Sequence, residues 1–448
     1  MFFSLVSREL LQHTLSYRYR TLLLMVVLVG IGATVVRTHV YLDLLGDHRR
    51  VVARRAHTRS DIPYYYFGLI MGYTRQKQPN SLAVFCNGLE NEMTRSLRAR
   101  RGMEDAIGPR ALSGLFFRIN PPFDITTVVA VVFSLAALLL THDSLSGERE
   151  RGTLKVLLAG PLAKGTVVGA KWTAGVVALG LPLAIAWVLG MLYLLLIARP
   201  AFGTAQWLAL VSMVVGSLVY CTVFLSAGLA CSAFCIKSST SLATCLFIWA
   251  ASTIIAPNLV APLARSIADV PSHASMHKLM EETYAESEAN HPKRFPHSAH
   301  PGSDTSHYRA VKAAQVAMES QQGVREAYQR FRNKLREQQT VASSLVGLSP
   351  ATAYTYLMSE LAGTGTGSYN LMHDLWQQAA TEYKAKQFAW ADSRNADDLP
   401  GFRPASLTIE DSLRTAFVPA LSLCAFAVLL FVSALLAFVL RARVHIQE

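Results

Sequence analysis

The stretch TAGVVALGLPLAIAWVLGMLYLLLI, residues 173–197, decides the fold, because it carries no charged residue over its whole length. A helix needs about 20 such residues to cross the roughly 30 Å hydrocarbon core of a bilayer. Pro182 is tolerated in a spanning helix when neighbouring groups satisfy the carbonyl that it frees. Of the 448 residues, 52% are hydrophobic and 16% charged, whereas a soluble protein has about 25% charged residues. The sequence therefore predicts a membrane protein.

Other apolar runs of spanning length lie on both sides of this stretch. They are residues 21–40, 123–141, 207–234, 241–263 and 416–440. Together with 173–197 they give six transmembrane helices, three of which fall within 173–263. We predict an all-α polytopic membrane protein with helical extracytoplasmic insertions.

The first 20 residues resemble a secretory signal peptide only superficially. MFFSLVSRELLQHTLSYRYR places charges and several amphipathic turns before the apolar run, and no small-residue cleavage site follows. Apolar side chains at positions 2, 3, 5, 6, 10 and 11 fit a helix that lies in the membrane interface. We predict an uncleaved interfacial entry helix over 1–20.

Two long polar segments, 41–122 and 264–414, separate the spans, and the short connections set the expected orientation. Lys and Arg are frequent at the N-terminus, in 142–171 and in the tail 441–448, whereas the short connection after 197 has only Arg199. An arginine cluster at 49–59 argues the other way, but long loops translocate largely regardless of their charge. We expect both termini in the cytoplasm and both long segments outside.

The most informative connection is HDSLSGERERGTLKVLLAGPLAKGTVVGAKW, residues 142–172. A polar turn leads into charged residues and then into a short apolar helix that ends at Gly160–Pro161. Such a segment suits a protein partner, because charges fix the register and apolar side chains fill a groove. The alternative is an ordinary juxtamembrane helix lying on lipid. Under the first interpretation we expect the turn to be solvent-exposed.

The order Ser-Gly-Glu-x-Glu-x-Gly-Thr-Leu, then Leu-Leu and Pro, resembles the signature of ABC-2 type transporter permeases. In that family the segment is similar to the coupling helix that enters a cleft on the ATPase subunit. Ala163-Lys164 departs slightly from a pattern that often has a basic residue shortly after the proline. The residues carried over for ATPase coupling are Glu148, Glu150, Gly152, Thr153, Leu154, Leu157, Leu158 and Pro161.

Two more stretches carry the resemblance. GLACSAFCIKSSTSLA (228–243) is similar to the turn between the fourth and fifth spans, and LSPATAYTYLMSELAGTGTGSY (348–369) to part of a subfamily with a large insert before the last span. That subfamily is related to copper-enzyme maturation and gliding-type permeases of the bacterial cytoplasmic (inner) membrane. The resemblance implies an ABC ATPase subunit as partner and a second permease copy or homologue. ATP and Mg would bind the ATPase, with no cofactor on this chain.

Two function classes remain open. One is ATP-driven movement of a substrate, expected to be export. The other is mechanotransmission, in which the spans act on an extracytoplasmic protein without passing cargo. Few polar residues occur in the spans, which is compatible with both.

Enzymatic motifs are missing from the sequence. Gly363-Thr-Gly-Thr-Gly367 lacks the Lys-Ser/Thr ending and the preceding strand of a phosphate-binding loop, so a flexible turn is the better interpretation. With no P-loop, the chain is not expected to hydrolyse ATP by itself.

Metal and nucleic-acid binding are weaker hypotheses. Irregular spacing and prolines make the histidine-bearing segment a weak metal candidate; its histidines are His291, His297, His300 and His307. The formal net charge of +12 is spread over two segments without a nucleic-acid-binding pattern. We therefore expect lipid or acidic protein, and no nucleic acid, as the partner of the basic residues. Five of the six cysteines lie in or beside apolar runs, where packing is the simplest role.

Overall fold

The computed structural model describes residues 2–61, 73–91, 93, 96–100, 103–105, 123–154, 163–268, 270, 329–389 and 409–447, with short pieces between 278 and 326. Six helical segments are long and apolar enough to cross a membrane, which confirms the predicted fold class. Their helices are α2 (Tyr17–Asp61); α4 (Ile125–Val128), the π-helix η3 (Val129–Phe133), α5 (Ser134–Thr141) and α6 (Ser146–Glu150); α8 (Lys164–Ile197); α9 (Thr204–Phe234); α10 (Ser238–Ala250), the π-helix η4 (Ala251–Ile255) and α11 (Ala256–Ile267); and α16 (Ile409–Gln447).

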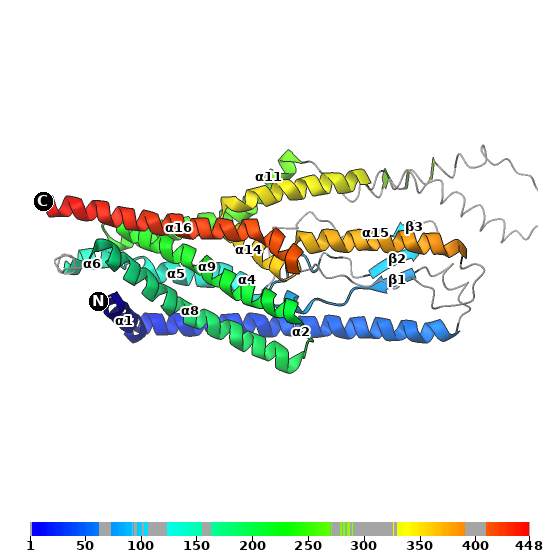
Figure 1. Ribbon diagram of the computed structural model, residues 1–448, viewed down its shortest axis with the longest axis horizontal. Helices are drawn as coiled ribbons and strands as arrows, with labels where there is room; N and C mark the ends of the chain where they lie inside the picture. The colour runs from blue at the N-terminus through cyan, green and yellow to red at the C-terminus, as the bar shows by residue number, and fades with distance from the viewer. Residues whose placement is uncertain are drawn as a thin grey trace, which may run out of the picture.

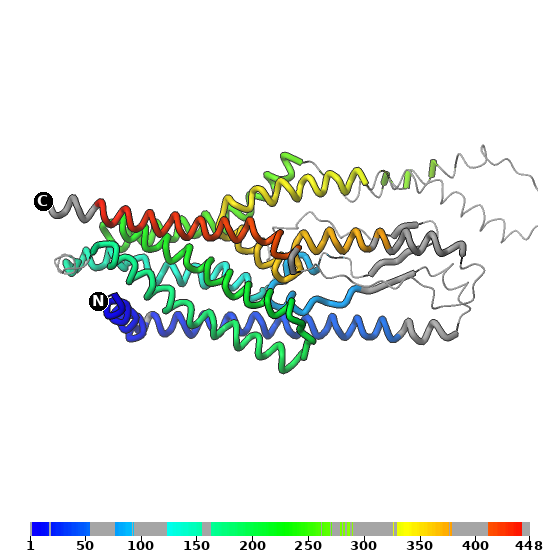
Figure 2. The backbone as a smooth tube through the Cα atoms, in the orientation of Figure 1, coloured from blue at the N-terminus to red at the C-terminus, as the bar shows by residue number. Residues whose placement is uncertain are grey.

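The spans form one elongated bundle whose two ends differ (Figure 1). Both chain termini and α6 lie at one end, here called the terminal end. Both long segments lie at the other, the insert end, where the described chain extends well past the spans (Figure 2). The first spanning helix is longer than predicted, because α2 continues as an unbroken helix from the expected span into the first polar segment.

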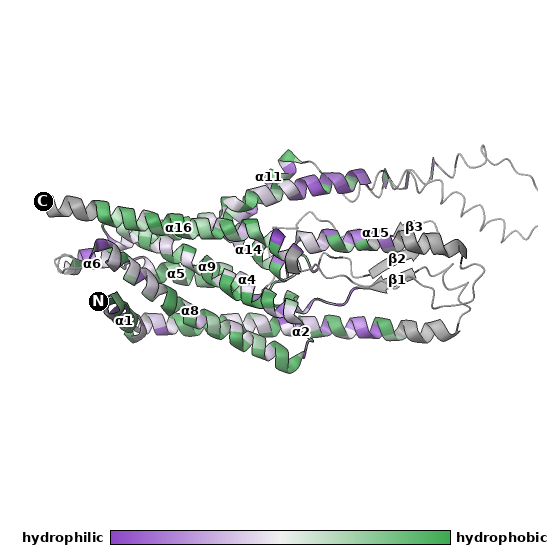
Figure 3. Ribbon diagram, viewed as in Figure 1, coloured by the Kyte–Doolittle hydropathy of each residue, from purple (hydrophilic) through white to green (hydrophobic). Residues whose placement is uncertain are grey.

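Hydrophobic residues predominate along the spans, and hydrophilic residues are more frequent toward the ends of the bundle (Figure 3). Between helices, small residues allow close approach. A Cβ on Gly190 of α8 would lie 2.8 Å from the Thr34 hydroxyl oxygen of α2, and one on Gly30 would lie 3.2 Å from Ala186 Cβ. Such small-residue contacts are typical of helices that pack within membranes.

Each long segment adds structure of its own at the insert end. The first contains the 3₁₀ turn η1 (Ser81–Val84) and a three-stranded antiparallel sheet, β1 (Tyr73–Gln76), β2 (Ser96–Arg100) and β3 (Met103–Asp105), in the order β1-β2-β3. The sheet was not anticipated from the sequence. The second contains a helix over 329–345, the 3₁₀ turn η5 (Val346–Leu348), α14 (Pro350–Leu361) and α15 (Thr366–Ala389).

Helix α14 belongs to the predicted outer insert but packs inside the bundle, against α9 and α16. The Tyr354 ring stacks on Tyr220 of α9 with centroids 4.3 Å apart, and the Tyr354 hydroxyl shares a hydrogen bond of 2.9 Å with the Ser217 hydroxyl. At the start of α14, the Ser349 hydroxyl donates to the Ser252 carbonyl at 2.5 Å, in the middle of the fifth span. The segment that carries α14 therefore enters the bundle from the insert end and returns to the same end.

Candidate functional site

The candidate coupling segment begins with a sharp turn between α5 and α6, at the terminal end. The Ser232 hydroxyl oxygen on α9 accepts hydrogen bonds from the backbone N–H groups of Leu145 and Ser146, at 2.9 and 3.0 Å. On α10, the Ser241 hydroxyl donates to the His142 carbonyl at 2.6 Å. Two serines on neighbouring spans thus satisfy backbone groups that the turn frees, and they fix the direction of α6.

Glu148 of α6 points into the protein. Its carboxylate lies 2.8 Å from the Lys171 ammonium of α8, which also lies 2.9 Å from the Glu9 carboxylate of α1 (Phe2–Leu15). All three residues are buried. The expectation that this turn is solvent-exposed is therefore wrong for Glu148. Its charge can be buried here because the Lys171 ammonium neutralises it. This ion-pair cluster joins three segments that are far apart in the sequence.

The next two residues hold the turn between the fourth and fifth spans. The Arg149 guanidinium donates to the Cys235 carbonyl, at the end of α9, at 2.7 Å. The exposed Glu150 carboxylate accepts from the Ser238 N–H, the first residue of α10, at 3.0 Å. A cation at a helix C-terminus and an anion at a helix N-terminus both complement the helix dipoles. Glu148, Arg149 and Glu150 thus each have an intramolecular partner.

Gly152 and its neighbours end α6. Gly152 has φ +73°, a left-handed conformation that favours glycine, and its N–H donates to the Arg149 carbonyl at 3.1 Å. Thr153 is exposed and its hydroxyl donates to the Glu148 carbonyl at 3.2 Å. Leu154 is only 8% exposed and packs among residues of α8, α9 and α16, which leaves little of its side chain for a groove on a partner; its coupling role stays a prediction. Leu157, Leu158 and Pro161 lie outside the described residues.

The entry helix α1 is placed against α8. Leu5 and Val6 pack on Ala170 and Ala174, whereas Phe3 is 83% exposed. One face of α1 is thus protein-bound and another is available to lipid, as the interfacial hypothesis requires. Neither Glu9 nor Ser232 was predicted from the sequence as a site residue. A charge on the apolar face of an amphipathic helix was the signal that could have identified Glu9.

A second buried carboxylate marks the insert end. Glu360 of α14 accepts hydrogen bonds from the N–H and hydroxyl of Thr366, both at 2.8 Å, from the Gly367 N–H at 3.4 Å and from the Thr415 hydroxyl at 3.2 Å. A Cβ on Gly365 would overlap the Glu360 carboxylate, so that position needs glycine. Burial raises the pKa of Glu360, and these donors oppose the shift. The glycine-rich turn thus surrounds a carboxylate of its own chain.

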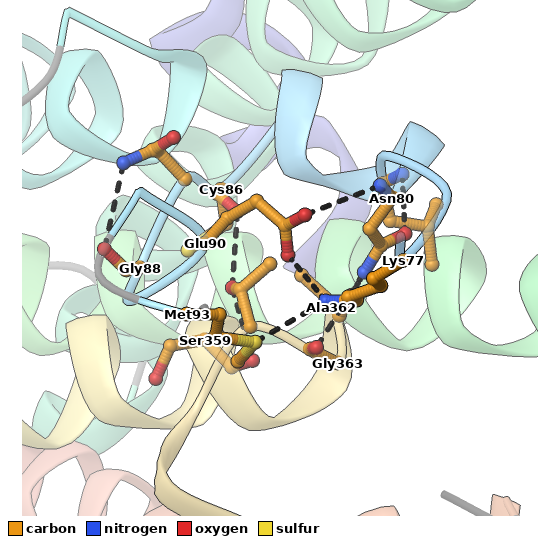
Figure 4. A network of polar contacts seen from close by, with 12 residues as sticks. Lys77, Asn80, Cys86, Gly88, Glu90, Met93, Ser359, Ala362 and Gly363 are labelled. Atoms are coloured by element: carbon orange, nitrogen blue, oxygen red, sulfur yellow. Dashed lines mark hydrogen bonds and ion pairs between the residues drawn. The ribbon is translucent and has the colours of Figure 1, made fainter. Parts of the chain in front are cut away.

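The loop after β1 closes on this turn (Figure 4). Lys77 pairs with Glu90 at 2.9 Å, and the Asn80 side-chain amide donates to the Ala362 carbonyl at 2.7 Å. The Leu89 N–H donates to the Thr364 carbonyl at 2.8 Å. Within the same loop, the Phe85 ring stacks on Trp187 of α8 with centroids 5.3 Å apart and joins the main core. The first insert and α14 therefore fill the insert end of the bundle together.

Metal binding finds no support in the part of the chain that the structure describes. No group of three or more His, Cys, Asp or Glu side chains there could hold a metal ion. The weak candidates His291, His297, His300 and His307 lie outside the described residues. The six cysteines are free thiols, and four of them are buried.

Comparison with known proteins identifies the family of the chain. No curated protein matches the chain. A family model described as "ABC-2 family transporter protein" matches residues 16–441, which include all six spans and both inserts. This match extends over nearly the whole chain, and the chain belongs to the ABC-2 transporter family.

Proposed function

We propose that this chain is the permease subunit of an ABC transporter of the bacterial cytoplasmic membrane and is driven by a separate ATPase subunit that docks at the terminal end. Membership of the ABC-2 family makes it a membrane transport component rather than a catalytic one. ATP and Mg would bind the partner. The observation that carries the proposal is the set of contacts made by α6, the segment that resembles the coupling element.

Helix α6 is well placed to pass motion to the spans. It continues from the second span, and Glu148 links it to α8 and α1 through Lys171. Arg149 and Glu150 link it to the ends of α9 and α10. A displacement of residues 146–161 by the ATPase would therefore move five segments together. This differs from a helix that merely lies on lipid, which needs no such connections.

A second copy of the chain would complete the working unit. The fifth span, α10–η4–α11, is the least covered of the six. Of its apolar 18-residue stretch 6% is buried, against 22% or more for each of the other spans. Its exposed side chains include Phe247, Ile255 and Asn258. We propose that this face contacts the second permease copy, because an amide in a span is costly when it faces lipid.

The substrate-moving role is the first candidate and mechanotransmission the second. The second is favoured by the insert end, where α14 and the loop at 77–93 fill the bundle of a single chain and are hydrogen-bonded to each other. Motion of α9 or α16 would reach α14 directly, since both helices pack against it. An extracytoplasmic protein would then receive that motion.

Charge reversal at Glu150 tests the docking proposal. Glu150→Lys is expected to leave the permease inserted, because exposed substitutions change stability by about 0.5 kcal/mol or less. It should lower the amount of ATPase that co-purifies, or leave ATP hydrolysis uncoupled from the permease in proteoliposomes. Glu150→Gln keeps an acceptor for the Ser238 N–H and separates the capping role from attraction to the ATPase. Asp47→Lys, an exposed acid-to-lysine change at the insert end, is the matched control.

The proposal fails if Glu150→Lys assembles with the ATPase and turns over ATP as the wild type does. Loss of assembly in Asp47→Lys as well would also contradict it, since that residue lies at the end where no ATPase is expected. Size-exclusion chromatography of each variant confirms that the permease itself is folded.

A further inference from the structure

A cavity of about 760 Å³ lies at the insert end, beside the loop that closes on α14. Its walls come from α2, the loop after β1, the connection between α8 and α9, the first turns of α9, the end of α14 with the turn after it, the first turns of α15, and the start of α16. Because α8 ends and α9 begins here, the cavity sits where the spans would leave the bilayer. Phe202 and Trp207, which pack edge to face nearby, are typical of that level. Its volume is in the range of sites for small organic ligands.

The charges around this cavity have one sign. Four basic residues line it, and no Asp or Glu is among its lining residues; the basic residues are His48, Arg49, Lys77 and Arg199. Lys77 is neutralised by Glu90. In the part of the chain that the structure describes, Arg49 and Arg199 form no ion pair. Two guanidinium groups are thus available to an anion, and the Nδ1 atom of His48 is buried without a hydrogen-bond partner.

The backbone at Arg199 is unusual. Its φ of +47° is the only positive φ of a non-glycine residue within the described ranges. A side chain in the left-handed region is strained, so such residues persist where the surroundings hold them and cluster at binding sites. Arg199 lies in the connection between α8 and α9, is exposed, and lines the cavity.

The rest of the lining is largely apolar. It includes Leu45, Leu82, Ala209, Leu361 and Leu413, which come from α2, the loop after β1, α9, α14 and α16. We propose that the cavity binds an anionic amphiphile: a phosphate or carboxylate headgroup held by Arg49 and Arg199, with its hydrocarbon chain along the apolar wall. Guanidinium groups bind both anions through paired hydrogen bonds. A membrane lipid with an anionic headgroup has this chemistry, and so does a free fatty acid.

Photo-crosslinking of the full-length chain in vesicles tests the site. The probe is a phosphatidic acid that carries a diazirine on its acyl chain, diluted in zwitterionic lipid, with labelled peptides identified by mass spectrometry. We expect labelling in 204–212 and 361–372, and about a tenfold loss in the double variant Arg49→Gln/Arg199→Gln, since two charge-assisted contacts are removed. Arg50→Gln is the matched control, because Arg50 is exposed, pairs with Asp47 and does not line the cavity.

Further experiments test the hydrocarbon chain separately from the headgroup, and distinguish a membrane lipid from a free fatty acid. Ala209→Trp fills the apolar wall without changing charge and should also reduce labelling. A diazirine fatty acid that labels the same peptides with the same arginine dependence would support the site and assign a free carboxylate as a ligand. Equal labelling by a zwitterionic diazirine lipid, or unchanged labelling in the arginine double variant, would overturn the proposal. Complete displacement of the lipid by millimolar inorganic phosphate would overturn the amphiphile assignment.

Discussion

The two ends of the bundle each bury a glutamate, but they hold it in different ways. At the terminal end, Glu148 is neutralised by Lys171, a residue of another span. At the insert end, the donors to Glu360 that the described part of the chain supplies are all neutral, and they come from the turn that follows it and from Thr415. The first arrangement connects separate segments through charge, and the second closes a local turn. Motion entering at α6 would therefore spread across the bundle, whereas the turn after α14 would move as one unit.

Removing the Lys171 charge should lower the free energy of unfolding more than any other change considered. Lys171→Met leaves the Glu9 and Glu148 carboxylates buried without their cation, which typically costs about 3–5 kcal/mol. The midpoint of thermal unfolding in detergent, followed by size-exclusion chromatography, should fall strongly. Lys164→Met, on the same helix but at a position without an ion pair in the described chain, is the control and should change little.

The triple variant Glu9→Gln/Glu148→Gln/Lys171→Met sharpens this prediction. It removes all three charges together, so most of the lost stability should return. If the triple variant is as unstable as Lys171→Met alone, the cost comes from lost packing of the lysine stem rather than from unpaired charge.

Truncating Glu360 should cause the second-largest loss of stability. Glu360→Ala leaves the Thr366 and Gly367 N–H groups without an acceptor and opens a cavity, at about 2–4 kcal/mol. Glu360→Gln keeps an acceptor oxygen and removes a charge that burial disfavours, so it should cost less than about 1 kcal/mol. Thermal unfolding of the two variants side by side measures the difference. Equal losses would show that Glu360 must be ionised, which would contradict the contrast with Glu148.

Much of the architecture follows from the sequence, because spans of about 20 apolar residues have few alternative structures. The connection at 142–172 was predicted to carry the coupling segment, and that role stays a prediction; the place of Gly152 at the end of α6 was not predicted. Its charges were expected to face a partner, yet Glu148 faces Lys171. That pairing depends on how α1 and α8 pack on the second span, and the spacing of residues along the chain does not reveal it.

The insert end was harder to predict for a different reason. The twelve residues of α14 are too few to span a bilayer, so hydropathy alone assigns them to the outer segment. Contacts with α9 and α16 place them in the bundle. The Gly-Thr-Gly-Thr-Gly turn was read as flexible, whereas Gly365 is required by its contact with the Glu360 carboxylate. A carboxylate six residues before the donors that bind it is not a recognised sequence motif.

The insert end should also respond to acid. Burial, with Arg332 and Arg336 nearby, lowers the pKa of His373 to about 3. Between that value and the unfolded pKa of about 6.5, the unfolded chain binds the extra proton, so stability falls as pH decreases through this window. At pH 5.5 the free energy of unfolding should be lower by about 1 kcal/mol because of His373. The stability of His373→Gln relative to wild type should therefore rise as pH falls from 7 to 5, and a constant difference would contradict the assignment.

The smallest effect is expected at Gly152, where the two ends again differ. At the insert end, Gly365 has no room for a side chain, but at Gly152 no atom of the described residues lies within 4 Å of the Cβ position. Gly152→Ala should therefore cost only the backbone strain of φ +73°, about 1 kcal/mol. Gly152→Asn should cost less, because asparagine tolerates the left-handed region better than alanine. Gly347→Ala, with open space and no positive φ, is the control for glycine replacement itself. Thermal unfolding ranks the three variants. A loss of about 3 kcal/mol or more in Gly152→Ala would mean that the coupling segment packs more tightly around this residue than its contacts indicate, since strain alone does not reach that size.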